Sequence, residues 1–241
     1  SIAAARLTPQ LYNQLKGARS ANGWSLDKSI RPAIEQSESR VGVTLGDFES
    51  YRLLDSFLRL VIEDLHPMVG VQPHIPDTKL HQLPRDLLQA ANPTLVRAAS
   101  VELYRCIQGS TFPPSMRRME RRRIQKLLSN ALIQLDNSSG VYSPLTSLGE
   151  VQPQPICISF EQLEASGCLQ DWPDGRGVYI SKSGNMEAWV NLQEHLKIIC
   201  SEPQGNIFAA VEQAVDTIAA LGRQLAGSRN SMAFEERFGY L

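Results

Sequence analysis

Residues 165–199 read ASGCLQDWPDGRGVYISKSGNMEAWVNLQEHLKII, and this segment indicates the architecture of the chain. The runs RGVYIS (176–181) and EAWVN (187–191) are rich in β-branched and aromatic residues, and the turn-forming residues Ser183, Gly184 and Asn185 lie between them. The run HLKIICS (195–201) follows after a short polar interval. The pattern predicts three short strands of an antiparallel meander.

Amphipathic helices are predicted on both sides of this meander. Apolar residues recur at helical spacing before it, at Ile124, Leu127, Leu128, Ala131 and Leu132. A basic outer face accompanies that stripe, at Arg117, Arg118, Arg121, Arg122 and Arg123. A second apolar stripe follows the meander, at Ile207, Phe208, Val211, Val215 and Ile218. Helices combined with clustered antiparallel strands predict an α+β fold.

The first part of the chain reads as a separate helical unit. Helical spacing after Asp47 relates Leu53, Leu54, Phe57, Leu58, Val61, Ile62 and Leu65. A Pro-rich, polar interval at about 70–93 then excludes both a helix and a central strand. We therefore expect a small helical domain over 1–90, with this interval as its linker, and an α+β domain over 94–241.

Composition excludes several classes of protein. The 241 residues are 42% apolar and 20% charged, with a formal net charge of -1, as in an ordinary globular protein rather than a disordered tail or a nucleic-acid coat. The four cysteines, Cys106, Cys157, Cys168 and Cys200, are too widely spaced for a disulfide framework. The sequence contains no run of 18 consecutive apolar residues, so no membrane span is predicted.

The segment quoted above strongly resembles the central block of the phosphagen (guanidino) kinases, the family of creatine and arginine kinases. Its matching residues are Asp171, Trp172, Pro173, Asp174, Arg176, Gly177, Trp189, Asn191, His195, Leu196, Ile198 and Ile199. LTPQLYNQLK (7–16), VGVTLGDFESY (41–51) and MAFEERFGYL (232–241) extend the likeness over the chain. It implies a small all-helical domain followed by an antiparallel sheet flanked by helices.

The resemblance also implies where a nucleotide would bind, and there the residues differ from the family. A family strand with the pattern SxRxR, followed by a further arginine, contacts the nucleotide phosphates. Here Ser100 and Glu102 stand at the first two arginine positions, and Arg105 is kept. Two cations are lost and one anion is gained, which disfavours a triphosphate.

Other positions implied by the family are altered as well. Gln193 stands where the family has its catalytic glutamate, and an amide cannot act as a base or a counter-ion. Lys197 replaces an arginine, which keeps the charge but loses the planar fork. Arg176 is kept and is favoured as a structural residue of the turn over a ligand contact. Arg105, Arg176 and Lys197 together leave open a weak anion site.

The substrate loop implied by the resemblance is changed too. Arg40 stands at a family glycine, Val41 follows it, and Thr44 replaces a tyrosine that contacts substrate in arginine kinases. No histidine occurs between Thr146 and Trp172, where the family has one that meets the adenine. We therefore expect no catalytic residues, no cofactor and no metal site, and we interpret His195 with Cys200 as structural.

These differences predict a degenerate, catalytically inactive phosphagen kinase that acts as a structural accessory subunit of a larger assembly. The chain stops where the family continues into its last third, so we expect other protein subunits to cover the sheet. We expect no nucleic-acid partner, and any membrane association only through the assembly. For the arginines at 117–123, we favour a solvated helix face over a patch that binds nucleic acid or anionic lipid.

The predicted location is the mitochondrion, in an ATP synthase or respiratory-chain assembly. The opening of the chain looks most like mitochondrial creatine kinases, and its first residue, Ser1, suggests either a processed terminus or a start from which a targeting segment is absent. Alternatives are the cytoplasm or cytoskeleton, with an axonemal scaffold role. Two further functions stay open: a guanidino kinase active only with a partner chain, and a regulatory module that binds a nucleotide or guanidino metabolite without turnover.

Overall fold

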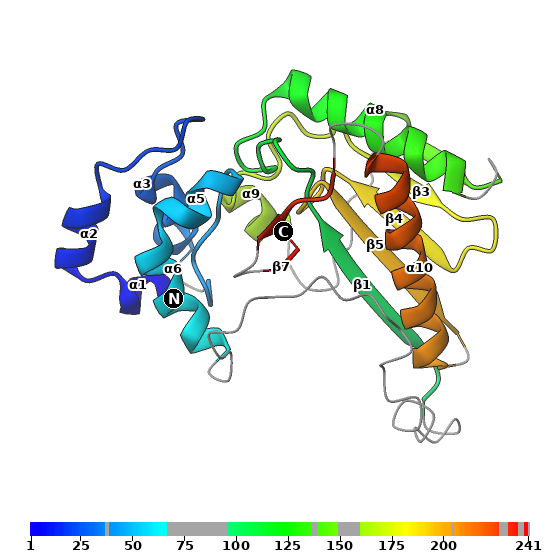
Figure 1. Cartoon of the computed structure of the whole chain (residues 1–241), viewed down its shortest axis with the longest axis horizontal. Helices are drawn as coiled ribbons and strands as arrows, with labels where there is room; N and C mark the ends of the chain where they lie inside the picture. The colour runs from blue at the N-terminus through cyan, green and yellow to red at the C-terminus, as the bar shows by residue number, and fades with distance from the viewer. Residues whose placement is uncertain are drawn as a thin grey trace. The chain divides into compact units, whose positions relative to one another are not determined.

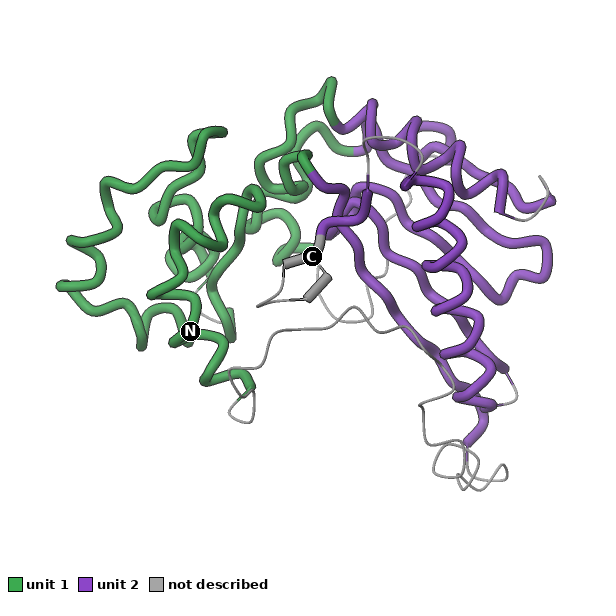
Figure 2. The backbone as a smooth tube through the Cα atoms, viewed as in Figure 1, with its two compact units in different colours: residues 1–73, 109–120, 150–172 green, residues 74–108, 121–149, 173–241 purple. Residues whose placement is uncertain are grey.

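The computed structural model divides into two compact units. It describes residues 1–36, 39–66, 96–135, 139–148, 160–203, 205–226, 231–235 and 239–240. Unit 1 comprises 1–73, 109–120 and 150–172, and unit 2 comprises 74–108, 121–149 and 173–241 (Figure 2). The predicted linker at about 70–93 lies outside the described residues, so the domain boundary stays a prediction.

Unit 1 is helical in the part that the structure describes. Its helices are α1 (Ile2–Arg6), α2 (Pro9–Leu15), α3 (Leu26–Ser29), α4 (Arg31–Glu35), α5 (Phe48–Leu53), α6 (Asp55–Leu65) and α9 (Phe160–Ala165). The side chain of Asp47 caps α5 in a reciprocal pair of hydrogen bonds with Ser50. The predicted single helix is divided at Leu54, whose side chain is buried with Phe57, Leu58 and Val61 in the core of this unit.

Unit 2 contains a five-stranded antiparallel sheet (Figure 1). Its strands are β1 (Ala99–Arg105), β2 (Val141–Pro144), β3 (Gly177–Ile180), β4 (Met186–Val190) and β5 (Leu196–Glu202), in the order β1-β5-β4-β3-β2. The 3₁₀ turn η2 (Leu145–Ser147) follows β2, and β6 (Phe234–Glu235) pairs with β7 (Gly239–Tyr240). The predicted meander and the α+β class are confirmed.

Two long helices accompany the sheet, α8 (Arg118–Leu135) and α10 (Ile207–Ala226). Helix α10 packs against β1 and β5, and its buried residues are Ala210, Ala214, Ile218, Leu221 and Leu225, whereas Val211 and Val215 of the predicted stripe are only partly buried. None of the helices in the described ranges is long and apolar enough to span a bilayer.

The prediction for Arg121 is wrong. The sequence predicts it on the basic outer face of the helix, but its side chain is fully buried. Arg121 lies three residues before Ile124 and seven before Leu128, so helical geometry puts it on the same face as these core residues. The positive charge of arginine predicts an exposed side chain, whereas the helical period correctly predicts that Arg121 lies on the buried face of α8.

The two faces of the sheet differ because side chains alternate along each strand. Leu196, Ile198 and Cys200 of β5 are buried on one face. We call the other the Lys197 face; it carries Ser100, Glu102, Tyr104, Glu187, Trp189, Lys197, Ile199 and Ser201, as the strand register shows. Cys106, Cys168 and Cys200 are buried free thiols, and Cys157 lies outside the described residues.

A buried asparagine holds the turn between β4 and β5. Asn191 has a φ of 57° and is fully buried. Its side-chain Nδ2 donates hydrogen bonds to the carbonyl of Arg121 in α8, at 2.9 Å, and to that of Gly175 before β3, at 2.7 Å. Its backbone N–H donates to the carbonyl of His195, at 2.9 Å. One side chain thus connects a helix, a strand entry and a turn.

His195 connects the same turn to the end of β1. Its ring is fully buried, and its Nδ1 accepts a hydrogen bond from the backbone N–H of Ile107 at 2.7 Å. Because Nδ1 is the acceptor here, the neutral ring carries its proton on Nε2. This contact supports the structural role that the sequence predicts for His195.

We expect Asn191→Gly to lower the free energy of unfolding by about 2–4 kcal/mol, because the buried carbonyls of Arg121 and Gly175 each lose a hydrogen bond while glycine tolerates the positive φ. Asn191→Ala should cost about 1–2 kcal/mol more through the left-handed backbone. Urea unfolding measures both, with Asn130→Ala on the exposed side of α8 as control. A loss for Asn191→Gly no larger than that of the control would contradict this role.

Candidate functional site

The pairing of β1 with β5 brings Glu102 and Lys197 together. Lys197 lies opposite Tyr104 in the register, and Glu102 precedes Tyr104 by two residues, so all three side chains share one face. The Nζ of Lys197 lies 3.1 Å from Oε2 of Glu102. The Lys197 side chain is 1% exposed and that of Glu102 is 14% exposed, so the ion pair is largely removed from solvent.

Tyr104 completes this cluster. Its hydroxyl donates a hydrogen bond to Oε2 of Glu102 at 2.5 Å, and the Nζ of Lys197 lies 5.4 Å from the centroid of its ring. The same carboxylate oxygen therefore faces both an ammonium group and a phenol, while the ammonium also contacts an aromatic face. The cluster is electrically neutral, so the Lys197 charge is compensated within the protein. We call it the Glu102–Tyr104–Lys197 cluster.

The remaining phosphate-site candidates are separated by the alternation of β1. Ser100 is exposed on the Lys197 face, opposite Ser201, and supplies no charge. Arg105 belongs to the opposite face, because it is one residue beyond Tyr104. One of its terminal nitrogens donates to the carbonyl of Tyr104 at 2.6 Å. The strand therefore does not bring Ser100, Glu102 and Arg105 together on one face.

Arg176 is fully buried at the entry to β3. Its Nη1 donates to the carbonyl of Asp174 at 3.1 Å. Its own carbonyl accepts from the side-chain amide of Gln125 at 2.9 Å and from the backbone N–H of Leu145 at 3.0 Å. Burial and these contacts favour a structural role for Arg176 in the turn that precedes β3, over binding of a solvent-borne anion.

The β4–β5 turn carries Gln193 and Glu194. Gln193 is half-buried, and its amide does not ionise. The thiol of Cys106 donates to Oε2 of Glu194 at 2.7 Å. Burial raises the pKa of the Glu194 carboxyl above its ordinary value, and this thiol contact lowers it in part. The turn therefore holds the Glu194 carboxyl, whose ionised form is disfavoured. Next to it, the neutral amide of Gln193 stands where the resemblance implies the catalytic glutamate.

Sequence reasoning did not single out Tyr104, Glu194 or Cys106. The alternation of β1 was a usable signal for Tyr104, since it places Tyr104 on the same face as Glu102. The contact between Cys106 and Glu194 had no such signal, because 88 residues separate the two. Only the folded sheet brings them together.

The predicted substrate loop lies in unit 1, and its backbone is engaged by helices. The carbonyls of Arg40 and Val41 accept from the N–H groups of Ile2 and Ala3, at 2.9 and 3.0 Å. Thr44 donates its N–H to the carbonyl of Ser29 at 2.9 Å. The Arg40 side chain is exposed, and Val41 packs against the helical core. Since each unit is described by itself, these residues are not placed relative to the Lys197 face.

Two further expectations meet the limits of the described residues. Within the described ranges, no group of three or more His, Cys, Asp or Glu side chains could hold a metal ion. The segment between Thr146 and Trp172, which contains no histidine, is described only over 146–148 and 160–172. The absence of an adenine contact there stays a prediction.

Comparison with known proteins matches both parts of the chain to one family. The model of the ATP:guanido phosphotransferase N-terminal domain matches residues 1–63, and that of the C-terminal catalytic domain matches residues 114–241. Lombricine kinase of Eisenia fetida is 28% identical over 98% of this chain and 66% of its own length. Creatine kinase M-type of Rattus norvegicus is 33% identical over 83% of this chain and 56% of its own length.

Solved structures agree on the fold. A crystal structure of lombricine kinase superposes with a TM-score of 0.89 at 25% identity, covering the whole of this chain and 68% of that one. The substrate-free duplicated taurocyamine kinase from Schistosoma mansoni gives a TM-score of 0.86 at 24% identity and is covered over 35% of its length, which supports the fold alone. The chain thus spans 56–66% of the length of the lombricine, glycocyamine and rat creatine kinases that it matches.

We expect Glu102→Gln to lower the free energy of unfolding by about 2–4 kcal/mol, because it leaves the buried Lys197 charge uncompensated. Urea unfolding measures this loss, with Glu212→Gln on the exposed side of α10 as the control. The double variant Glu102→Gln with Lys197→Met should recover part of the loss. If Glu102→Gln behaved like the control, the two charges would not be coupled as the structure shows.

Proposed function

This chain belongs to the ATP:guanido phosphotransferase family, the phosphagen kinases, and we propose that it is a catalytically inactive member that serves as a structural accessory subunit of a larger assembly. The family enzymes named in the comparison act as lombricine, glycocyamine and creatine kinases. Phosphoryl transfer depends on positive groups that hold the nucleotide phosphates and on groups that position the nucleophile. Both requirements are altered here.

The observation that carries the proposal is the Glu102–Tyr104–Lys197 cluster. Glu102 stands at a position where the family has a phosphate-binding arginine, and its carboxylate is 3.1 Å from the only cation on the Lys197 face among the described strand residues. A phosphate that approached Lys197 would meet a carboxylate already bound to it. Repulsion between unit charges is roughly 4 kcal/mol at about 4 Å with an effective dielectric constant of about 20. The cluster therefore opposes nucleotide binding.

Gln193 supports the same proposal from the nucleophile side. The resemblance assigns to its position the glutamate that holds the guanidinium group, and a neutral amide offers such a group no counter-charge. The neighbouring carboxyl, Glu194, accepts a hydrogen bond from the thiol of Cys106, and burial raises the pKa of this carboxyl. It is a poor substitute, because its ionised form is disfavoured and its Oε2 already accepts a hydrogen bond.

We expect the purified chain to show no binding of Mg-ATP by calorimetry at millimolar concentration. We also expect no transfer of phosphate to lombricine, glycocyamine or creatine, with rat M-type creatine kinase as positive control. The variant Glu102→Arg with Gln193→Glu should gain measurable nucleotide affinity, because it restores one cation and removes the competing carboxylate. Phosphorylation of any of these guanidines by the unaltered chain would refute the proposal.

One alternative is favoured by family membership itself. The chain covers about two thirds or less of its relatives, so a guanidino kinase whose site is completed by further protein would have the same fold. The ATP and guanidine assays, repeated on the native assembly, separate the two. Activity that copurifies with the assembly and is lost on Gln193→Ala would favour this alternative.

We place the accessory role in a mitochondrial energy-converting membrane complex, an ATP synthase or a respiratory-chain assembly. The likeness of residues 7–27 to the opening of mitochondrial creatine kinases supports this location. A cytoskeletal or axonemal scaffold is the competing location. The two locations predict different proteins that should copurify with the chain.

After mild-detergent extraction of the native source, we expect the chain to migrate on native gels with a large mitochondrial complex, identified by mass spectrometry of the same band. Recovery with tubulin or actin assemblies would favour the scaffold alternative. Recovery only as a free protein of about the 26.7 kDa chain mass would contradict an accessory role in either place.

A further inference from the structure

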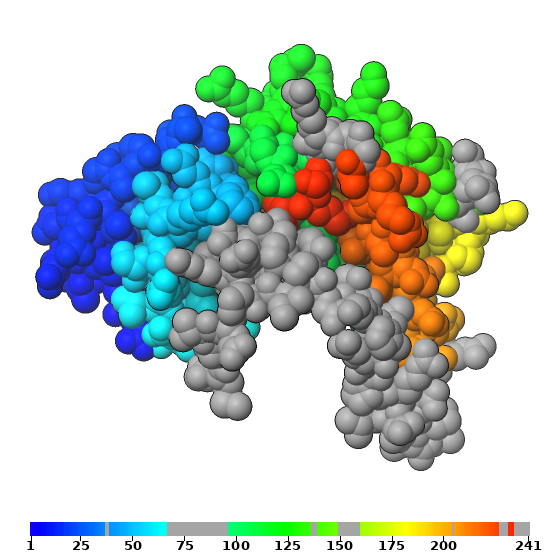
Figure 3. All heavy atoms as spheres, viewed as in Figure 1, coloured from blue at the N-terminus to red at the C-terminus, as the bar shows by residue number. Residues whose placement is uncertain are grey.

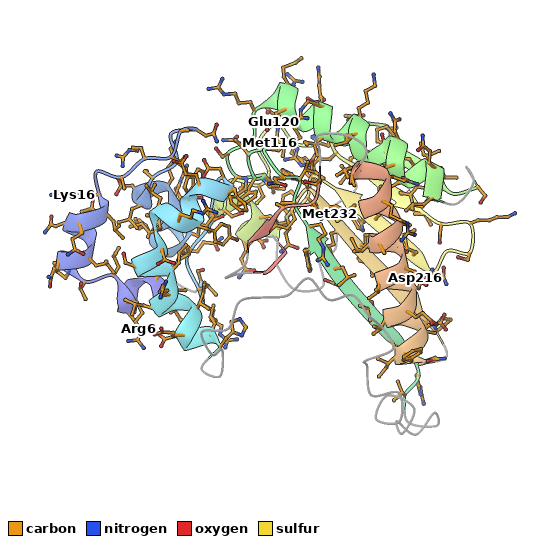
Figure 4. All side chains as sticks on the ribbon, in the orientation of Figure 1. Arg6, Lys16, Met116, Glu120, Asp216 and Met232 are labelled. Carbon is orange, nitrogen blue, oxygen red and sulfur yellow. The ribbon has the colours of Figure 1, made fainter. Side chains whose placement is uncertain are left out.

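The outer side of α8 carries a concentrated positive charge. Its exposed cations are Arg118, Arg122, Arg123 and Lys126, and the helical period places them on one side together with Met119. Met119 is 74% exposed. Figure 3 shows α8, in green, along the surface, and Figure 4 shows its long side chains projecting from the helix. We call these five residues the α8 basic face.

No acidic residue of α8 lies on that face. Glu120 is the only acidic residue between Arg118 and Leu135, and its carboxylate accepts from the N–H and hydroxyl of Thr111, at 3.0 and 2.6 Å. The whole chain has a formal net charge of -1, so the positive charge is a local feature and not a property of the composition. Such a face attracts a partner of opposite charge.

The spacing of these cations along α8 does not favour the helix itself. Arg118, Arg122 and Lys126 follow one another at a spacing of four residues, where like charges repel. Arg118 and Arg122 also lie near the helix N-terminus, where the helix dipole disfavours positive charge. A local arrangement that opposes helix formation is typical of functional surfaces.

One contact within the protein shows which chemistry the face accepts. The Nε of Arg122 lies 3.1 Å from Oδ1 and 2.9 Å from Oδ2 of Asp174, so this guanidinium already binds a carboxylate. Three of the four cations are arginines, whose planar forks match carboxylate groups, and exposed methionine and arginine are both enriched at protein interfaces. We propose that the α8 basic face docks an acidic segment of a partner protein.

This inference rests on the accessory role proposed above, because it names the surface through which a subunit would be held. It does not rest on the loss of catalysis, since none of its residues belongs to the Glu102–Tyr104–Lys197 cluster. The ATP assay therefore tests the loss of catalysis, and the binding assay below tests the docking surface. A negative result in one does not decide the other.

The test uses the whole chain and a fluorescent peptide of alternating aspartate and glutamate, followed by anisotropy at low and at high salt. We expect Arg123→Gln with Lys126→Gln to weaken binding roughly tenfold, because two exposed charges are removed from the face. The matched control, Lys182→Gln with Arg223→Gln, removes two cations elsewhere in unit 2 and should change affinity less than about twofold. Binding should also weaken with salt.

Phosphatidylcholine vesicles that contain phosphatidylserine provide the second arm. Peptide binding that depends on Arg123 and Lys126, and exceeds binding to these vesicles, supports the proposal. Equal losses in the two double variants, or an absence of peptide binding by the unaltered chain, would overturn it. Stronger binding to the vesicles, lost in Arg123→Gln with Lys126→Gln, would also overturn it and assign the face to a membrane surface.

Discussion

The two hydrogen bonds from the side chain of Asn191 fix the centre of unit 2. They join the carbonyls of Arg121 and Gly175, which lie far apart in the sequence, to the turn between β4 and β5. Each carbonyl is removed from water, so each needs a donor from within the protein. His195 then ties the same turn to the end of β1. The start of β5 is held at both sides, and the register of β5 against β1 follows from it.

That register decides the chemistry of the Lys197 face. A shift of one residue would move Lys197 to the apolar face, because side chains alternate along a strand. With the observed pairing, Lys197 lies opposite Tyr104 and within 3.1 Å of Glu102. A buried ion pair of this kind adds little net stability, although the loss of one partner is costly. Its consequence is therefore chemical, since it compensates a cation that would otherwise attract phosphate.

The chain separates two kinds of surface. The strands present a neutralised cluster where the resemblance implies phosphate-binding arginines, whereas α8 presents four exposed cations around Met119, of which Arg122 is paired with Asp174. A protein that lost phosphoryl transfer would have no need of an uncompensated cation on the sheet. A protein held in an assembly would need exposed, complementary charge. The two features agree with one accessory role.

Local periodicity and residue identity are enough to predict the strand meander, the α+β class, the family and the substitutions at Ser100, Glu102, Gln193 and Lys197. The helical period already carries the burial of Arg121, and strand alternation already puts Arg105 and Glu102 on opposite faces of β1, but the break at Leu54 has no such local signal. The sequence also could not bring Cys106 to Glu194 or Lys197 to Glu102. These pairings appear only in the folded protein, because strand register and turn geometry are set by contacts between residues distant in the chain.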